Sequence, residues 1–256
     1  MKHLVIILSF FITTSCYCQD EFSSVSNWQS FAIPLIKDSL EKYGFDLLGE
    51  WKVFIKDNDV VATKNRYFTL DSLPFKIIPS KDEEHKIGGR QSFLKVDDGY
   101  LVGFYRGEWG GNLFWFSDDG KTKYEISNHE IVKFIKRNNK IYAIEGLSHL
   151  GNSRGSIIEI KKTNNQWTTS EYIKLPSAPY GVDVDYKNNF IIITSKSLLA
   201  VTPDSKVKFL IKEGIWDYGL YPTSLIIKKN IAFMGMRKGI FKYNLITKKQ
   251  EWLMPK

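Results

Sequence analysis

The stretch Asp97–Ile126, DDGYLVGFYRGEWGGNLFWFSDDGKTKYEI, contains three short apolar strands separated by turns. Asp98-Gly99 and Asp119-Gly120 are dipeptides typical of tight turns between antiparallel strands. The first two strands are joined by Arg106–Gly111, a loop in which three glycines accompany one arginine, one glutamate and one tryptophan. The stretch therefore predicts an antiparallel sheet with a polar, glycine-rich loop at one end.

A polar turn followed by an apolar strand recurs along the chain at nearly constant spacing. The strands after these turns begin at Val60, Tyr100, Ile141, Phe190 and Ile231, at intervals of 40, 41, 49 and 41 residues. A four-stranded antiparallel blade takes about 40–45 residues, and repetition at that length is the signature of a β-propeller. The sequence therefore predicts an all-β fold, a five-bladed β-propeller of four-stranded antiparallel blades with a short N-terminal helix.

The predicted strands account for nearly all residues after Gly49. Both faces of a blade meet neighbouring blades, so the strands are almost continuous apolar runs, as in Phe190–Ile193. The predicted strands are 51–55, 60–63, 67–70 and 75–78; 92–96, 100–104, 113–116 and 123–126; 131–135, 141–144, 156–160 and 170–173; 181–184, 190–194, 198–201 and 206–211; and 223–227, 231–234, 240–243 and 251–254.

Residues 1–18 have the layout of a secretory signal peptide. A basic start precedes the apolar run Leu4–Ile12, which is too short to span a bilayer. Cleavage after Cys18 is one interpretation. A lipid anchor at Cys16 is the other, because Thr14–Cys16 resembles a loose lipobox. Both interpretations predict export, to the periplasm or the medium in the first case and as an outer-membrane lipoprotein in the second.

Residues 19–49 are predicted to form a linker and a short helix outside the propeller domain, which takes residues 50–256. The helical segment falls within Trp28–Gly44, where Gly44 is a C-terminal stop signal. Both cysteines of the chain lie in the predicted signal peptide. The domain must therefore be stabilised by its core, without disulfides, a cysteine-based zinc site or a thiol nucleophile.

The net charge of +8 comes from 36 basic residues, of which six are arginines. The lysines are scattered over strand edges and turns, which is typical of a solvated surface that protects sheet edges. The alternative is attraction to anionic glycans, envelope lipids or an acidic partner. Nucleic acid is not an expected partner, because no basic cluster is present.

Candidate ligand-binding residues follow from the topology of propellers. Loops between second and third strands, and those that join blades, emerge at one end of the ring around the central channel. The longest of these loops here are 105–111, 145–155, 79–90, 176–180 and 213–222. The candidates selected from these loops and from the turn after the fifth blade's second strand are Arg106, Glu108, Trp109, Glu145, His149, Arg154, Trp216, Tyr221 and Arg237.

Each candidate has a functional and a structural interpretation. Arg106 and Glu108 could hold a polar ligand while Trp109 stacks on a sugar or amine, or they could form an ion pair that closes the loop while Trp109 fills the channel. Glu145 and His149 could act as an acid/base couple. No metal site or cofactor is predicted, because the spacing of the histidines is not diagnostic.

The remaining candidates are aromatic or flank the loops. Trp216 and Tyr221 could form a stacking platform or seal a loop. The glycines around Glu108 are costly in a strand, so we expect them to bring the backbone close to a ligand and to aim Glu108 and Arg106 inward. On this hypothesis Glu108→Gln keeps the fold and weakens binding about tenfold, or about 1.4 kcal/mol.

Four motifs carry a resemblance to an uncharacterised group of exported bacterial β-propeller proteins. They are GEWGG (Gly107–Gly111), EGLSHLG (Glu145–Gly151), GLYPTSL (Gly219–Leu225) and MGMRKG (Met234–Gly239). The similarity extends from about Gly89 to Pro255. It implies a propeller fold and a role for these loops, and it transfers no catalytic residue.

Two functions from different classes remain open at this point. The first is a monomeric cell-envelope protein that binds a polar small molecule, a glycan or a partner protein at the channel mouth. The second is a hydrolase or lyase that uses Glu108 with Glu145 or His149 as acid and base. Convergence of these side chains on an open pocket would favour catalysis, and salt bridges among them would favour binding.

Overall fold

A computed structural model describes residues 22–34, 49–65 and 67–256 of the chain. The predicted signal peptide and most of the predicted helix, from residue 35 onward, lie outside these described residues. No helix in the described part of the chain is long and apolar enough to cross a membrane.

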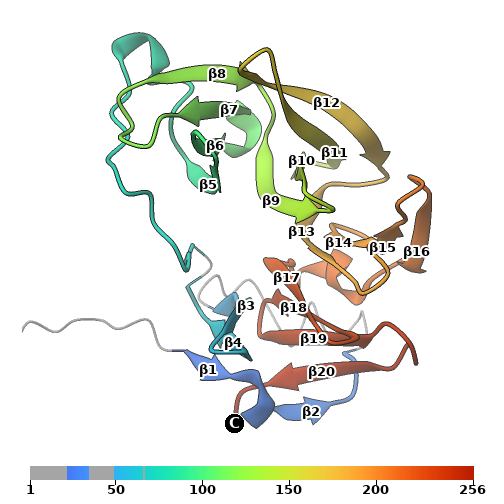
Figure 1. Cartoon of the computed structure of the whole chain (residues 1–256). Coiled ribbons are helices and arrows are strands. Elements are labelled where there is room, and N and C mark those ends of the chain that lie inside the picture. The colour runs from blue at the N-terminus through green and yellow to red at the C-terminus, as the bar shows by residue number, and fades with distance from the viewer. Residues whose placement is uncertain (1–21, 35–48, 66) are drawn as a thin grey trace, which may run out of the picture.

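Five antiparallel sheets surround a central axis, so the predicted five-bladed β-propeller is confirmed (Figure 1). The strands are β1 (Ser23–Ser24), β2 (Gln29–Phe31), β3 (Lys52–Lys56), β4 (Asp59–Thr63), β5 (Arg90–Val96), β6 (Gly99–Tyr105), β7 (Gly111–Phe116), β8 (Lys123–Ser127), β9 (Ile131–Arg137), β10 (Lys140–His149), β11 (Asn152–Thr163), β12 (Gln166–Leu175), β13 (Pro179–Val184), β14 (Phe190–Thr194), β15 (Leu198–Val201), β16 (Val207–Ile211), β17 (Ser224–Lys228), β18 (Ile231–Met236), β19 (Gly239–Asn244) and β20 (Gln250–Met254). Four 3-10 turns accompany them, η1 (Val25–Asn27), η3 (Lys81–Glu83), η4 (Gly107–Trp109) and η5 (Ile215–Tyr218).

The innermost strand of each blade is its first strand in chain order after residue 50. These inner strands are β3, β5, β9, β13 and β17, and contacts run from β5 through β9, β13 and β17 to β3. The three middle blades are plain four-stranded meanders, β5–β8, β9–β12 and β13–β16. The ends of the inner strands therefore define the wall of the central channel.

The predicted turns are present where the sequence placed them. Asn58, Asn139 and Asn188 have positive φ angles of 57°, 60° and 60°. Asparagine tolerates this left-handed conformation better than most residues, because its short side chain can form local hydrogen bonds. These turns set the register of each hairpin and hence which side chains face the neighbouring blade.

Buried apolar clusters fill the space between the blades from the second to the fifth and between the fifth and the first, as expected for strands that are apolar on both faces. Between the third and fourth blades, the Tyr142 and Phe190 rings meet edge to face with centroids 5.1 Å apart. Corresponding clusters contain Leu113 and Ile131, Ile193 and Leu225, and Val60 and Ile240. The blades are therefore held to one another by their faces.

The first blade differs from the prediction. Residues 67–70 and 75–78 are irregular, although they were expected to be strands, and β1 supplies the third strand of the sheet β3-β4-β1. Phe75 instead packs against Tyr100 and Phe116 of the second blade, with centroids 5.6 and 5.7 Å apart. Prolines at 74 and 79 lack a backbone donor, which disfavours a paired strand between them. This segment runs from the first blade to the second (Figure 1).

The predicted linker also needs correction, because part of it belongs to the propeller. β1 pairs with β4 of the first blade, and β2 pairs with β20 at the outer edge of the last blade. Between them Trp28 packs on Trp51 at 4.7 Å and donates to the Ser23 hydroxyl at 2.8 Å. Gln29–Phe31 is thus a strand within the segment expected to hold a linker and a short helix, and this segment joins the first blade to the last.

A buried hydroxyl provides a second connection between these blades, and it yields a stability prediction. The Val53 amide of β3 donates to the Ser224 hydroxyl of β17 at 2.9 Å. Ser224→Ala leaves that buried N–H without its partner, so we expect a loss of about 1–2 kcal/mol in the free energy of unfolding. Urea unfolding measures it, with Ser30→Ala in the exposed strand β2 as control. Equal losses in both variants would contradict this role.

Candidate functional site

A cavity of about 420 Å³ opens within the central channel. Its walls are the first residues of the inner strands, together with Tyr67–Asp71 from the segment that links the first two blades. Inner strands begin at the end of the ring where the second-to-third-strand connections emerge, as the pairing of Arg90 with Tyr105 shows. The cavity therefore lies at the end that the sequence predicted for a ligand.

Three basic side chains line this cavity, Lys52, Arg90 and Lys133. The Lys52 ammonium donates to the Phe68 carbonyl at 2.6 Å. The Lys133 ammonium donates to the carbonyls of Val182 at 2.8 Å and Leu225 at 3.4 Å. The walls also carry aromatic and aliphatic side chains, among them Phe54, Phe93, Tyr180 and Ile226.

Burial and mutual repulsion act on these lysines. Burial, followed by the charges of Arg90 and Lys133, lowers the pKa of Lys52 from 10.5 to about 8. Burial also lowers the pKa of Lys133, against the opposing charge of Asp183. Two ammonium groups are thus held in surroundings that disfavour their charge.

A second polar cluster surrounds the buried Glu130, which precedes β9. Its Oε1 accepts a hydrogen bond from Arg154 at 2.9 Å, while Oε2 is buried without a partner among the described residues. Burial raises the pKa of Glu130, Arg154 opposes that shift, and the charge of Glu145 adds to it. Burial also raises the pKa of Tyr105, whose ring lies 4.9 Å from the Arg90 guanidinium.

Glu108 and His149, one of the predicted acid/base pairs, contact each other. Glu108 Oε2 and His149 Nε2 lie 2.7 Å apart, and both side chains are more than 40% exposed. Glu145 accepts from the Ser156 hydroxyl at 2.6 Å. Glu108 and His149 therefore bridge two neighbouring blades at the surface of the rim. The tenfold effect expected of Glu108→Gln stays a prediction.

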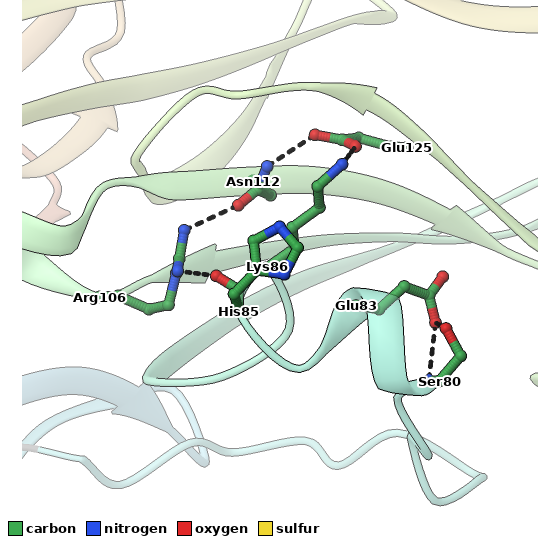
Figure 2. A network of polar contacts seen from close by, with 7 residues as sticks. All are labelled: Ser80, Glu83, His85, Lys86, Arg106, Asn112 and Glu125. Atoms are coloured by element: carbon green, nitrogen blue, oxygen red, sulfur yellow. Dashed lines mark hydrogen bonds and ion pairs between the residues drawn. The ribbon is translucent and has the colours of Figure 1, made fainter.

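The Arg106 guanidinium, which was expected to be aimed inward, makes contacts within the protein. Its guanidinium donates to the His85 carbonyl and, at 3.0 Å, to Asn112 Oδ1 (Figure 2). Asn112 in turn donates to Glu125 at 2.6 Å, and Lys86 pairs with the same carboxylate at 2.7 Å. Arg106 thus ties residues 80–87 to the second blade.

The glycines of this loop allow left-handed backbone conformations and a close contact between backbone segments. Gly107 and Gly110 have φ angles of 64° and 83°, which favour glycine. A Cβ on Gly111 would lie 2.7 Å from the Glu130 Cα and 2.6 Å from the Phe104 carbonyl oxygen. The expected close approach is present, but it is to the start of the third blade. It positions Glu130, and Glu108 remains exposed.

Residues 145–155, expected to be a loop, form the end of a long hairpin. Strands β10 and β11 stay paired up to His149 and Asn152, with Leu150 and Gly151 at the tip. Leu150 is 89% exposed and Trp109, on the neighbouring blade, is 75% exposed. Trp109 therefore does not fill the channel.

Two of the remaining candidates are structural. Trp216 is 2% exposed, and its indole donates to the Thr194 carbonyl at 2.9 Å. Arg237 is buried, pairs with the buried Glu50 at 3.0 Å and lies 4.2 Å from the Tyr221 ring. The predicted stacking platform is wrong for Trp216, which is in the core, whereas Tyr221 is exposed beside Arg237.

Sequence reasoning missed Glu130, Lys52 and Lys133. Glu130 directly precedes the apolar strand β9. Lys133 interrupts the apolar start of that strand, and Lys52 interrupts β3. A charge within the first strand of a blade was the available signal, because that strand faces the channel. No group of three or more metal-ligating side chains occurs in the described ranges.

Comparison with known proteins yields distant similarities only. No protein-family model matches the chain, and no curated protein does. Among solved structures, a streptogramin B lyase has 15% identity and a TM-score of 0.45, covering 63% of this chain and 53% of its own. An extracellular domain of a one component system from B. thetaiotaomicron has 14% identity and a TM-score of 0.46, over 66% of this chain and 23% of its own.

A GH43 endo-arabinanase from Bacillus licheniformis is more distant, with 11% identity and a TM-score of 0.38 over 62% of this chain and 75% of its own. The chain thus spans about half the length of the lyase and less of the extracellular protein. The structural neighbours are β-propeller proteins that include extracellular domains, lyases and hydrolases. At these identities and TM-scores they assign no ligand to this chain.

Proposed function

We propose that this protein is an exported cell-envelope β-propeller that binds a polar small molecule in the cavity at the loop end of its channel. The observation that supports the proposal is the 420 Å³ cavity, whose lining combines basic groups with aromatic and aliphatic side chains. Ligand sites of about 300–1,000 Å³ typically have this mixture of apolar walls and a few polar groups. A cavity of this size suits a small molecule or the terminal unit of a glycan.

The contacts of the rim favour binding over the acid/base mechanism considered from sequence. Glu108 and His149 pair with each other, and Glu145 is hydrogen bonded to Ser156. None of these three side chains lines the cavity, so none is placed to exchange a proton with a ligand bound there. These residues are better suited to shape the entrance.

A hydrolase or lyase is the second candidate, and Glu130 is the observation that favours it. This carboxyl group is buried, has one oxygen without a partner among the described residues and has a raised pKa. A buried carboxyl whose pKa is raised is a candidate general acid. Release of nitrophenol from chromogenic glycosides and esters, lost in Glu130→Gln, would support this candidate.

A cavity-filling variant tests the proposed function. Ser92 lines the cavity, so Ser92→Trp is expected to fill it and to abolish binding of the small molecules and glycans that bind the exported protein. Ser170→Trp, on the exposed face of the outer strand β12, is the matched control. Binding is measured by calorimetry, and folding by circular dichroism. Ligands that bind both variants equally would place the site outside the channel.

A further inference from the structure

We infer that the channel cavity is an anion site, which takes an organic molecule with one carboxylate or phosphate group and an apolar body. The inference rests on the proposed function and narrows it to a ligand class. It is carried by the arrangement of Lys52, Arg90 and Lys133 around one cavity. They come from the inner strands of three different blades.

The balance of charge in the cavity is positive. Asp71 is the one acidic side chain in the cavity lining that the structure describes, and it lies on the exposed linking segment. Asp183 acts on Lys133 from the next inner strand. Its two oxygens accept the amides of Val184 at 2.8 Å and Ile227 at 2.7 Å, so that carboxylate is held by the backbone.

The two lysines keep donors for a ligand. An ammonium group has three N–H donors. Lys52 uses one of them on the Phe68 carbonyl, and Lys133 uses two on the Val182 and Leu225 carbonyls. Each lysine therefore retains at least one donor within the described structure. An anion bound between the two lysines would offset the repulsion of Lys52 by Arg90 and Lys133. A neutral ligand would not offset it.

Burial of the two lysine charges opposes folding, although each lysine donates to backbone carbonyls. Basic side chains that only solubilise a protein lie on its outside, where water solvates the charge. Lys52 and Lys133 instead lie in the channel, where burial opposes their charge. Like charges gathered at a partly desolvated site mark places where an opposite charge binds.

The apolar part of the lining defines the rest of the ligand. Phe54 and Phe93 stand on the inner strands of the first and second blades, and Tyr180 and Ile226 on those of the fourth and fifth. These walls would bury an aliphatic or aromatic body. The anionic group then selects the orientation of the ligand.

A matched pair of probes tests the inference on the exported protein. Phenylacetate and phenylacetamide have nearly the same shape and differ in charge. By calorimetry at low salt and neutral pH, we expect phenylacetate to bind at least tenfold more tightly. Phenyl phosphate and inorganic phosphate form a second arm, which decides whether the site prefers phosphate to carboxylate and whether the apolar body is needed.

Two charge-removing variants locate the site. Lys52→Met and Lys133→Met are each expected to weaken phenylacetate or phenyl phosphate at least tenfold and to leave phenylacetamide within twofold. Lys208→Met, on the exposed outer strand β16, is expected to change neither. Should Lys133→Met fail to fold, Lys52→Met alone decides.

The outcomes separate this inference from the proposed function. Equal affinities for the acid and the amide, both lost in Ser92→Trp, would overturn the anion site and leave the binding function standing. Binding of neutral sugars without binding of any anion would also overturn the anion site and leave the binding function standing. If Ser92→Trp affects no ligand at all, both proposals are wrong.

Discussion

Replacing Arg237 by methionine is expected to lower the free energy of unfolding by about 3–5 kcal/mol. Arg237 and Glu50 form an ion pair of 3.0 Å between side chains that are 9% and 3% exposed. Without the guanidinium, a carboxylate remains buried beside the junction of the first and last blades. For a domain of this size the midpoint of thermal unfolding should fall by roughly 10 °C.

Two further variants isolate the cause of that loss. Arg237→Met combined with Glu50→Gln removes both charges, so we expect it to recover much of the stability. Lys249→Met breaks an ion pair with Glu251 that is exposed on the lysine side, and it should cost less than about 1 kcal/mol. If Arg237→Met leaves stability unchanged but abolishes phenylacetate binding, Arg237 is a ligand contact, as the sequence suggested.

The repeat could be predicted because it depends on local chemistry. The first two strands of a blade are joined by a turn residue such as Asn139 or Asn188, and the apolar runs between turns have the length of a strand. The closure of the ring could not be predicted in this way. The pairing of β1 with β4 and of β2 with β20 joins residues far apart in sequence, and the short segment Ser23–Ser24 has no apolar pattern of its own.

The proposed site lies at the end of the ring that loop length indicated, but none of the candidate residues lines its cavity. The loops themselves turned out to contact one another, as Arg106 does through His85 and Glu108 through His149. The groups that face the cavity are single lysines on inner strands. Their orientation depends on which face of a strand points inward, which only the register of the whole sheet decides.

Lys52→Met is expected to make the protein more stable while it abolishes anion binding. The fall in the pKa of Lys52 from 10.5 to about 8 corresponds to a cost of about 3 kcal/mol for holding its charge in the folded state. Loss of the bond to the Phe68 carbonyl would offset about 1 kcal/mol of the gain. A net gain of about 2 kcal/mol should raise the midpoint of thermal unfolding by roughly 5 °C.

The pH dependence of this gain identifies the charge as its cause. Below pH 8 the lysine is protonated in both folded and unfolded chains, so the wild type bears the full cost. Between pH 8 and 10.5 the folded chain releases the proton first, and the cost disappears as the pH rises. The advantage of Lys52→Met should therefore shrink across that range, whereas Lys208→Met should stay within about 0.5 kcal/mol of wild type throughout. A Lys52→Met variant that is less stable at every pH would show that the ammonium is a structural donor. The expected pattern, a residue that costs stability and is needed for binding, is that of a site maintained for its ligand.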